Sequence, residues 1–193
     1  MAFWVVTTSE RSVLSDLTFR GVESFPEPAF SALRREAFAD YETSRLLTDV
    51  LAQEEATGVP VSATDAGALR IGCFRGETLV AWTYARPSGD RQLSMINSGV
   101  AAAERRCGIY SRLVGMVVEH AAARGDAAVA SRHAANNNPV IIAKLKLGFF
   151  VSGFEYSEVY GPLVRLTYLV GGLRRTLHHT RARPLRRIDA NDA

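Results

Sequence analysis

Hydrophobic residues recur along the chain with two different spacings, which separate expected helices from expected strands. From Ala29, and again from Ser44, apolar positions return every three or four residues, and this spacing predicts two amphipathic helices. Before them, the β-rich run at residues 3–8 predicts an edge strand, and Pro26 and Pro28 indicate an irregular lead into the first helix. The chain is therefore expected to begin with one strand and two helices.

Strands dominate the next part of the sequence. β-rich runs at residues 69–74 and 78–85 flank a short turn, and a further run covers residues 91–100, so we expect an antiparallel meander. The apolar positions then change to helical spacing from Ile109, and this helix is expected to stop near Gly125.

The last part of the sequence alternates between the two patterns. Residues 127–131 predict a short buried strand, parallel to its neighbour and reached by a helical crossover. Pro139, at a first helical turn, begins a short helix that ends at Gly148, and residues 149–156 and 163–170 predict a final hairpin. The order of elements is thus ααβββαβαββ, preceded by one strand.

A basic, glycine-bearing loop precedes the helix that begins at Ile109. Arg105 and Arg106 lie just before Gly108, and the chain after Glu104 has no acidic residue until Glu119. Backbone amides in the first turn of a helix lack internal partners, and the helix dipole adds partial positive charge there. The pattern predicts a site for a pyrophosphate, while a solvated helix cap would have the same sequence.

Two short segments carry a family resemblance. One reads Arg105-Arg-Cys-Gly108-Ile-Tyr110 and the other Asn137-Asn-Pro-Val-Ile-Ile-Ala-Lys-Leu-Lys-Leu-Gly-Phe149. They resemble the motifs Arg/Gln-x-x-Gly-x-Gly/Ala and Asn-x-x-Ala-x-x-x-Tyr-x-Lys-x-Gly-Phe of the GNAT superfamily of acyl-CoA-dependent N-acyltransferases. The resemblance covers roughly residues 68–170. Two of its departures bear on the site: Tyr110 replaces a Gly or Ala, and Lys144 replaces a frequent tyrosine that donates a proton to the leaving thiolate.

The resemblance implies both a fold and an activity. The fold would be α/β (α+β), with a mixed, mostly antiparallel sheet of six to seven strands, flanked by about four helices and splayed at the acyl-CoA site. The activity would be N-acyl transfer, most simply of acetyl from acetyl-CoA (or another acyl-CoA), to a small-molecule or peptide amine by direct attack in a ternary complex. The alternative is a catalytically silent acyl-CoA-binding sensor or interaction module.

The same resemblance implies which residues hold the cofactor. They follow the end of a strand, the basic loop and the first helical turn. They are Ser98, Val100, Ala102, Arg105, Arg106, Cys107, Gly108, Ile109, Tyr110 and Ser111. Asn137 would reach the pantetheine arm from the other side, and its side chain also suits the N-cap of the following helix.

Three residues are candidates for catalysis. Many relatives carry a glutamate on the strand before the loop, but that strand has no carboxylate here, and Asn97 could only position water. His133 is expected beside the thioester, where an ordinary histidine pKa suits a general base, or it caps the Asn-rich turn. Lys144 could donate a hydrogen bond to the leaving thiolate or the carbonyl, or it is a surface lysine.

Acceptor recognition in this fold usually comes from the bend between the first two helices and from the last hairpin. In this sequence those segments contain carboxylates and tyrosines, which suit a cationic amine by charge and by cation–π contact. The candidates are Asp40, Tyr41, Glu42, Glu155, Tyr156, Glu158 and Tyr160. The same residues are also ordinary polar residues of loops.

Length and charge indicate one domain with a basic tail. A chain of 193 residues with 47% hydrophobic content suits a single core, expected over residues 1–172. The net charge is +3, and residues 174–193 contain six arginines against two aspartates. The tail at residues 173–193 has no aromatic side chain to stack on bases, so nucleic acid is not the expected partner. We expect it to be solvated or to pack against a partner, with a homodimer favoured by family analogy.

Other features limit the compartment and the chemistry. Cys73 and Cys107 are too few for a disulfide framework and have no metal-ligand spacing, so we expect no metal site and a reducing compartment. The start of the sequence does not resemble a signal peptide, and no apolar run approaches about 20 residues, the length of a membrane span. A cytoplasmic protein is therefore expected.

Overall fold

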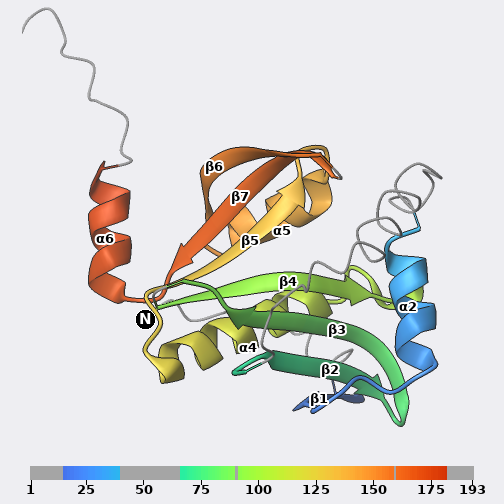
Figure 1. The fold of residues 1–193 in the computed structure, drawn as a ribbon. Coiled ribbons are helices and arrows are strands. Elements are labelled where there is room, and N and C mark those ends of the chain that lie inside the picture. The colour runs from blue at the N-terminus through green and yellow to red at the C-terminus, as the bar shows by residue number, and fades with distance from the viewer. Residues whose placement is uncertain (1–14, 40–65, 90, 159, 182–193) are drawn as a thin grey trace, which may run out of the picture.

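The computed structural model describes residues 15–39, 66–89, 91–158 and 160–181. Within these ranges seven strands form one sheet, in the spatial order β1-β2-β3-β4-β5-β7-β6 (Figure 1). All neighbouring strands are antiparallel except β4 and β5, which are parallel. This is the mixed, mostly antiparallel sheet that the sequence predicts.

The described elements follow one another in the expected alternation. The strands are β1 (Leu17–Gly21), β2 (Leu69–Arg75), β3 (Thr78–Pro87), β4 (Gln92–Val100), β5 (Ala128–Ala134), β6 (Phe150–Ser157) and β7 (Gly161–Leu169). The helices are α2 (Ala29–Ala37), α4 (Ile109–Arg124), α5 (Asn138–Lys146) and α6 (Gly172–Arg181), and a 3-10 turn covers Ala102–Glu104. Of these helices, none combines the length and hydrophobicity needed to cross a membrane.

The two ends of the described chain differ from the prediction. The lead before the first helix was expected to be irregular, but it contains strand β1, which pairs antiparallel with β2. After Gly171 the chain was expected to leave the fold, but it forms helix α6. The strand expected at residues 3–8 and the helix expected from Ser44 lie outside the described residues.

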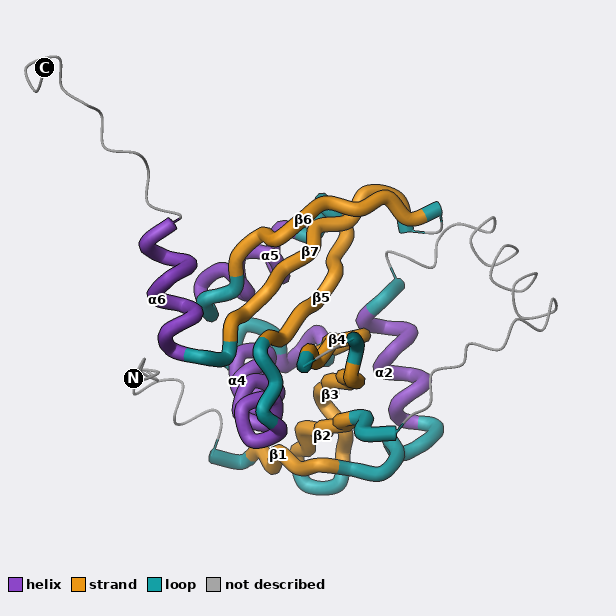
Figure 2. Tube along the Cα trace, turned by 60° about the vertical axis from the view of Figure 1, so that its left-hand side comes forward, coloured by secondary structure: helices purple, strands orange, loops and turns teal. Residues whose placement is uncertain are grey.

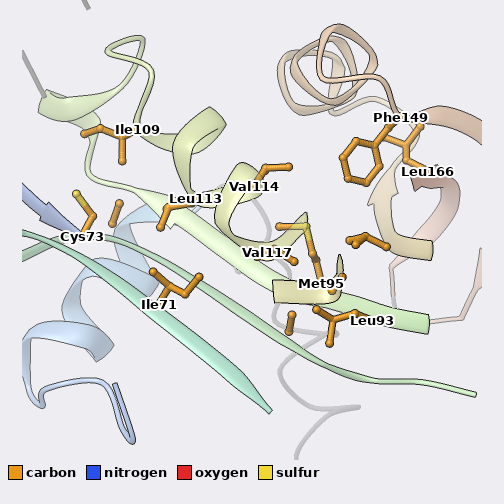
Figure 3. Close-up of a cluster of buried hydrophobic side chains, with 14 of the residues drawn as sticks. Ile71, Cys73, Leu93, Met95, Ile109, Leu113, Val114, Val117, Phe149 and Leu166 are labelled. Carbon is orange, nitrogen blue, oxygen red and sulfur yellow. The ribbon is translucent and has the colours of Figure 1, made fainter. Parts of the chain in front are cut away.

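Helices α4 and α2 cover opposite faces of the sheet. In β3, consecutive residues point to opposite faces, and Ala81 belongs to the core under α4 while Trp82 belongs to the core under α2. Leu113 and Val117 on α4 have no exposed surface and pack against the first of these faces (Figure 3). On the other face, Leu33 of α2 belongs to the cluster around Trp82.

The sheet opens between β4 and β5. Their parallel pairing covers only Gln92 to Met95 against Ala128 to Ser131. Beyond Met95 a bulge at Ile96 bends β4, because Met95 and Asn97 pair with consecutive residues of β3. From there β4 continues beside β3 while β5 continues beside β7, and the two halves of the sheet diverge (Figures 1 and 2). The splayed pair of strands is confirmed.

Candidate active site

A cavity of about 810 Å³ lies where β4 and β5 separate. Its walls come from α2, β4, the start of α4, β5, α5 and the β6–β7 hairpin. Nine residues singled out from the sequence line it, including all three catalytic candidates. They are Asn97, Ser98, Tyr110, His133, Asn137, Lys144, Glu155, Tyr156 and Tyr160. The structure therefore brings together residues that lie up to about sixty positions apart in the sequence.

The basic loop gives α4 an open N-terminus. Gly108 is the N-cap residue with φ 80°, a left-handed conformation that glycine adopts without strain, and Arg106 also has a positive φ of 65°. No side chain caps this helix, and its first turn contains no acidic residue. The amides of the first turn are therefore available to an anion, as the chemistry of a pyrophosphate requires.

Two backbone groups at the end of β4 and just after it already form hydrogen bonds within the chain. The backbone N–H of Ala102 donates to Glu36 Oε1 at 2.7 Å, and the carbonyl of Val100 accepts from Arg105 Nε at 3.1 Å. The Ala102 amide is thus not available to a pantetheine arm in the way the sequence analysis expected. Cys107 Sγ donates to the Arg105 carbonyl at 3.5 Å.

Tyr110 fits at the small-residue position of the loop because its ring turns inward. It packs against the core between α4 and the sheet, and burial raises the pKa of its hydroxyl. The ring also forms part of the cavity wall. The departure from the motif therefore does not obstruct the backbone amides at the start of α4.

Lys144 is buried at the cavity wall, so the surface-lysine interpretation is wrong. Its exposed fraction is 0%, and its Nζ donates to Met95 Sδ at 2.9 Å and lies 4.2 Å from the centre of the Phe149 ring. Burial lowers the pKa of Lys144 to about 7. At neutral pH the amine can therefore exist in both protonation states.

Solved structures of acetyltransferases share the fold of this chain. The ribosomal-protein-S18-alanine N-acetyltransferase from Escherichia coli is 17% identical, over 80% of this chain and 94% of its own, with a TM-score of 0.61. A probable acetyltransferase from Staphylococcus epidermidis is 15% identical, over 80% of this chain and 99% of its own, with a TM-score of 0.63. A GNAT family acetyltransferase from Elizabethkingia anophelis with acetyl-CoA bound is 13% identical, over 80% and 99%, with a TM-score of 0.56.

The chain has the GNAT fold. At these identities the likeness is one of fold. No protein-family model matches the sequence, and no curated protein matches it either.

Asn137 lies on the opposite side of the GNAT-fold opening from the basic loop. It is the N-cap residue of α5, where its Oδ1 accepts from the Val140 amide at 3.5 Å, and it also lines the cavity. The helix-capping role and a contact with a pantetheine arm are therefore compatible at this position.

His133 has surroundings that suit a neutral imidazole. Its Nε2 lies 3.0 Å from Ser131 Oγ, two residues back on β5, rather than on the Asn-rich turn. Burial, together with the nearby charge of Lys144, lowers the pKa of His133 to about 3. A group with this pKa is a weak base at neutral pH, which removes the reason for which the sequence analysis considered it.

Asn97 and Ser98 are tied to β3. Asn97 Oδ1 accepts from Trp82 Nε1 at 2.8 Å, and the hydroxyls of Ser98 and Thr83 lie 2.7 Å apart. The Asn97 oxygen is thus committed to holding the Trp82 ring, which leaves its amide nitrogen as the group that could position water.

The expected acceptor residues only partly line the cavity. Asp40, Tyr41 and Glu42 lie outside the described residues, Tyr156 lines the cavity, and Glu158 is exposed away from it. Glu155 and Tyr160, which were also considered, do line it.

Sequence reasoning missed two arginines of the cavity wall. Arg34 comes from α2, one position after the buried Leu33, and the helical spacing there marks only the apolar side. Arg132 lies on β5, which continues three residues beyond its predicted end. Its Nη1 lies 3.4 Å from Glu155 Oε2 on β6.

Proposed function

We propose that this protein transfers an acyl group, most simply acetyl from acetyl-CoA, to the amine of a small molecule or peptide by direct attack in a ternary complex. The observation that carries the proposal is the opening between β4 and β5, bounded by the uncapped start of α4 and the Asn137-capped start of α5. The acetyltransferase activity named for the structural neighbours supports it.

The residues at the opening fit a CoA ester. The amides of residues 106–111 would bind the pyrophosphate, with positive charge added by Arg105 and Arg106. Asn137 would contact the pantetheine arm from the side of α5. Bound acetyl-CoA would supply an acetyl group activated as a thioester.

Lys144 is the proposed proton donor. An ammonium at the cavity wall can protonate the sulfur as it leaves, and a pKa of about 7 lets it release that proton at neutral pH. Asn97 would position a water molecule that removes the proton from the acceptor amine. His133 would remain neutral and form a hydrogen bond with Ser131 at the cavity wall.

Two measurements test the proposal. Calorimetric titration with acetyl-CoA should show binding, and Gly108→Val should weaken it roughly 10-fold or more without unfolding the protein, because valine disfavours a positive φ. The matched control is Gly115→Val, which changes an α4 glycine with open space around it. Absence of binding at near-millimolar acetyl-CoA would overturn the proposal.

Release of free thiol distinguishes the enzyme from a silent acyl-CoA-binding module. The assay would use acetyl-CoA with polyamines, amino acids, aminosugars and peptide N-termini. Turnover on any of them supports the enzyme. Binding of acetyl-CoA with no thiol release on all of them would instead support the sensor or interaction module.

A further inference from the structure

The described part of the cavity wall has an excess of positive charge. It contains Arg34 and Arg132 from two different elements, against one carboxylate, that of Glu155. Glu155 is already bound to Arg132, whose side chain remains 63% exposed. Among the described residues no carboxylate forms an ion pair with Arg34.

The same face of the sheet carries more arginine next to the cavity. Arg165 on β7 lies directly opposite Arg132 on β5, so both side chains share a face, and Arg165 Nη2 donates to Gln92 Oε1 at 3.2 Å. Arg86 on β3 pairs with Ser94, which shares the face of Gln92 on β4. Arginines on β7, β5 and β3 therefore share this face, and of these three Arg132 lines the cavity.

In the proposed function this basic face would be the acceptor side of the opening. Trp82, under α2, lies on the same face of β3 as Arg86, whereas α4 and its open N-terminus lie on the other face. The figures show α2 and the tip of the β6–β7 hairpin at the same end of the molecule, on either side of the opening (Figures 1 and 2). Arg34 and Arg132 thus lie across the sheet from the loop proposed to hold the pyrophosphate.

We infer that the acceptor is an amine that also carries a carboxylate, as an amino acid does, and that Arg34 and Arg132 bind this carboxylate. The inference rests on the proposed function. The guanidinium fork matches a carboxylate with two parallel hydrogen bonds, whereas a second ammonium on a diamine would meet like charge. This assignment differs from the cationic amine expected from the sequence. Of the carboxylates in that expectation, Asp40 and Glu42 lie outside the described residues, Glu158 does not line the cavity, and Glu155 is paired with Arg132.

The experiment compares an acceptor that has this charge with its amide, at equal concentrations of the neutral amine, because amidation also lowers the pKa of the amine. Phenylalanine and phenylalaninamide would be assayed by thiol release; the amide keeps the amine and the ring but lacks the negative charge. The native protein should have a kcat/KM at least ~10-fold higher for the acid, the scale of one charge-assisted hydrogen bond. An equal or lower value for the acid would overturn the inference while leaving the proposed function in place.

Variants connect the preference to the two arginines. Arg34→Gln and Arg132→Gln should each lower kcat/KM for phenylalanine about 10- to 100-fold, mainly by raising KM, with little effect on the amide. Glu155→Gln releases Arg132 from its partner and should lower KM for the acid. Arg35→Gln is the matched control, because Arg35 is the next residue on α2 and does not line the cavity. Equal losses on both acceptors would mean that the arginines act only structurally.

A binding measurement separates failure of the inference from failure of the proposed function. N-acetylphenylalanine and its amide would be titrated calorimetrically into the protein in the presence of CoA. Tighter binding of the acid, lost in Arg34→Gln, supports the carboxylate site even if no acceptor is turned over. Equal binding of the two overturns it. Phosphoethanolamine and ethanolamine form a second pair. If the preference for phosphoethanolamine over ethanolamine is larger than the preference for the acid over the amide, the site is assigned to phosphate.

Discussion

Lys144 is the residue whose environment most strongly constrains the chemistry. A lysine without exposed surface loses the hydration of its ammonium, and neither the Met95 thioether nor the Phe149 ring replaces that hydration with an opposite full charge. Its pKa is lowered for this reason. A buried, unneutralised amine at a cavity wall destabilises the fold, and proton transfer in the cavity gives a functional reason for its presence.

The first prediction at this scale concerns stability and pH. Because the pKa of Lys144 is about 7 in the folded protein and 10.5 when unperturbed, the unfolded chain binds more protons between these values. The free energy of unfolding should therefore rise as pH rises through this window. Below the window both states bind the proton, so the full free-energy cost of burying the Lys144 ammonium should be present. Lys144→Met, which keeps the shape but removes the charge, should stabilise the protein by on the order of 4 kcal/mol at pH 6.5 and by less at pH 10.

Urea unfolding at several pH values measures this difference. Lys146→Met is the matched control, because Lys146 is exposed on the same helix and should show little change at any pH. A stabilisation by Lys144→Met that is the same at pH 7 and pH 10 would contradict the burial of a titrating amine at residue 144.

The second prediction concerns turnover. If Lys144 protonates the leaving thiolate, Lys144→Ala should lower kcat by about 10- to 1000-fold, and Lys144→Tyr should recover part of the rate. In the native protein, turnover should fall as pH rises through about 7, because the ammonium form is lost, and this fall should be absent in Lys144→Ala. A weaker affinity for acetyl-CoA with an unchanged kcat would instead mean that Lys144 only contacts the cofactor.

At the scale of elements, helix α5 shows why the sequence placed Lys144 only in part. The motif identifies its position, but the apolar residues of this helix, Val140, Ile141 and Leu145, do not by themselves indicate that a lysine between them is buried. In the structure Leu145 is 44% exposed and Ile142 is 51% exposed, while Lys144 is buried. Ile141 does pack against the core, and Lys144, three residues later on the same side of the helix, is buried toward Met95 and Phe149.

The other elements also differ in how well the sequence predicts them. Strands β2 to β7 and helix α4 were predictable because their apolar residues repeat over many positions. Strand β1 is five residues long with one buried side chain, Leu17, so its periodic signal is short. Helix α6 has only two apolar side chains, Leu173 and Leu177, within a basic segment, and neither is buried. The uncapped start of α4 was predictable from local chemistry at Gly108. Arg34 and Arg132 were not, because only the packing of α2 and the length of β5 bring them to one cavity.

At the scale of the whole molecule, the opening follows from how little joins the two halves of the sheet. Strands β1–β4 and β5–β7 share only the four-residue parallel pairing of β4 with β5, and α4 packs across β2, β3, β4 and β5. The halves are thus held together at one end and apart at the other, where Tyr110, Asn137 and Lys144 gather. In the proposed function, one side of this opening would hold the cofactor and the other the acceptor.

Helix α6 is joined to the end of this framework that lies away from the opening (Figure 1). Arg175 Nη1 donates to the carbonyls of Leu169 and Val170 at 2.7 and 2.6 Å, and its guanidinium lies 5.3 Å from the Tyr168 ring. The ring of His178 stacks on Phe150 at 3.7 Å. These contacts tie the helix to the ends of β7 and β6.

The last prediction follows from these contacts. Deleting residues 173–193 should lower the free energy of unfolding by about 1–3 kcal/mol, because two hydrogen bonds from a charged donor and the stacked ring are lost. Affinity for acetyl-CoA should not change, because no residue of α6 lines the cavity. Deleting residues 182–193 alone keeps α6 and is the control for stability. If both deletions leave stability unchanged, α6 contributes nothing to the fold.

A change in sedimentation on either deletion would reveal the dimer that family analogy favours. Loss of salt-sensitive binding to DNA would instead indicate a nucleic-acid role for the tail.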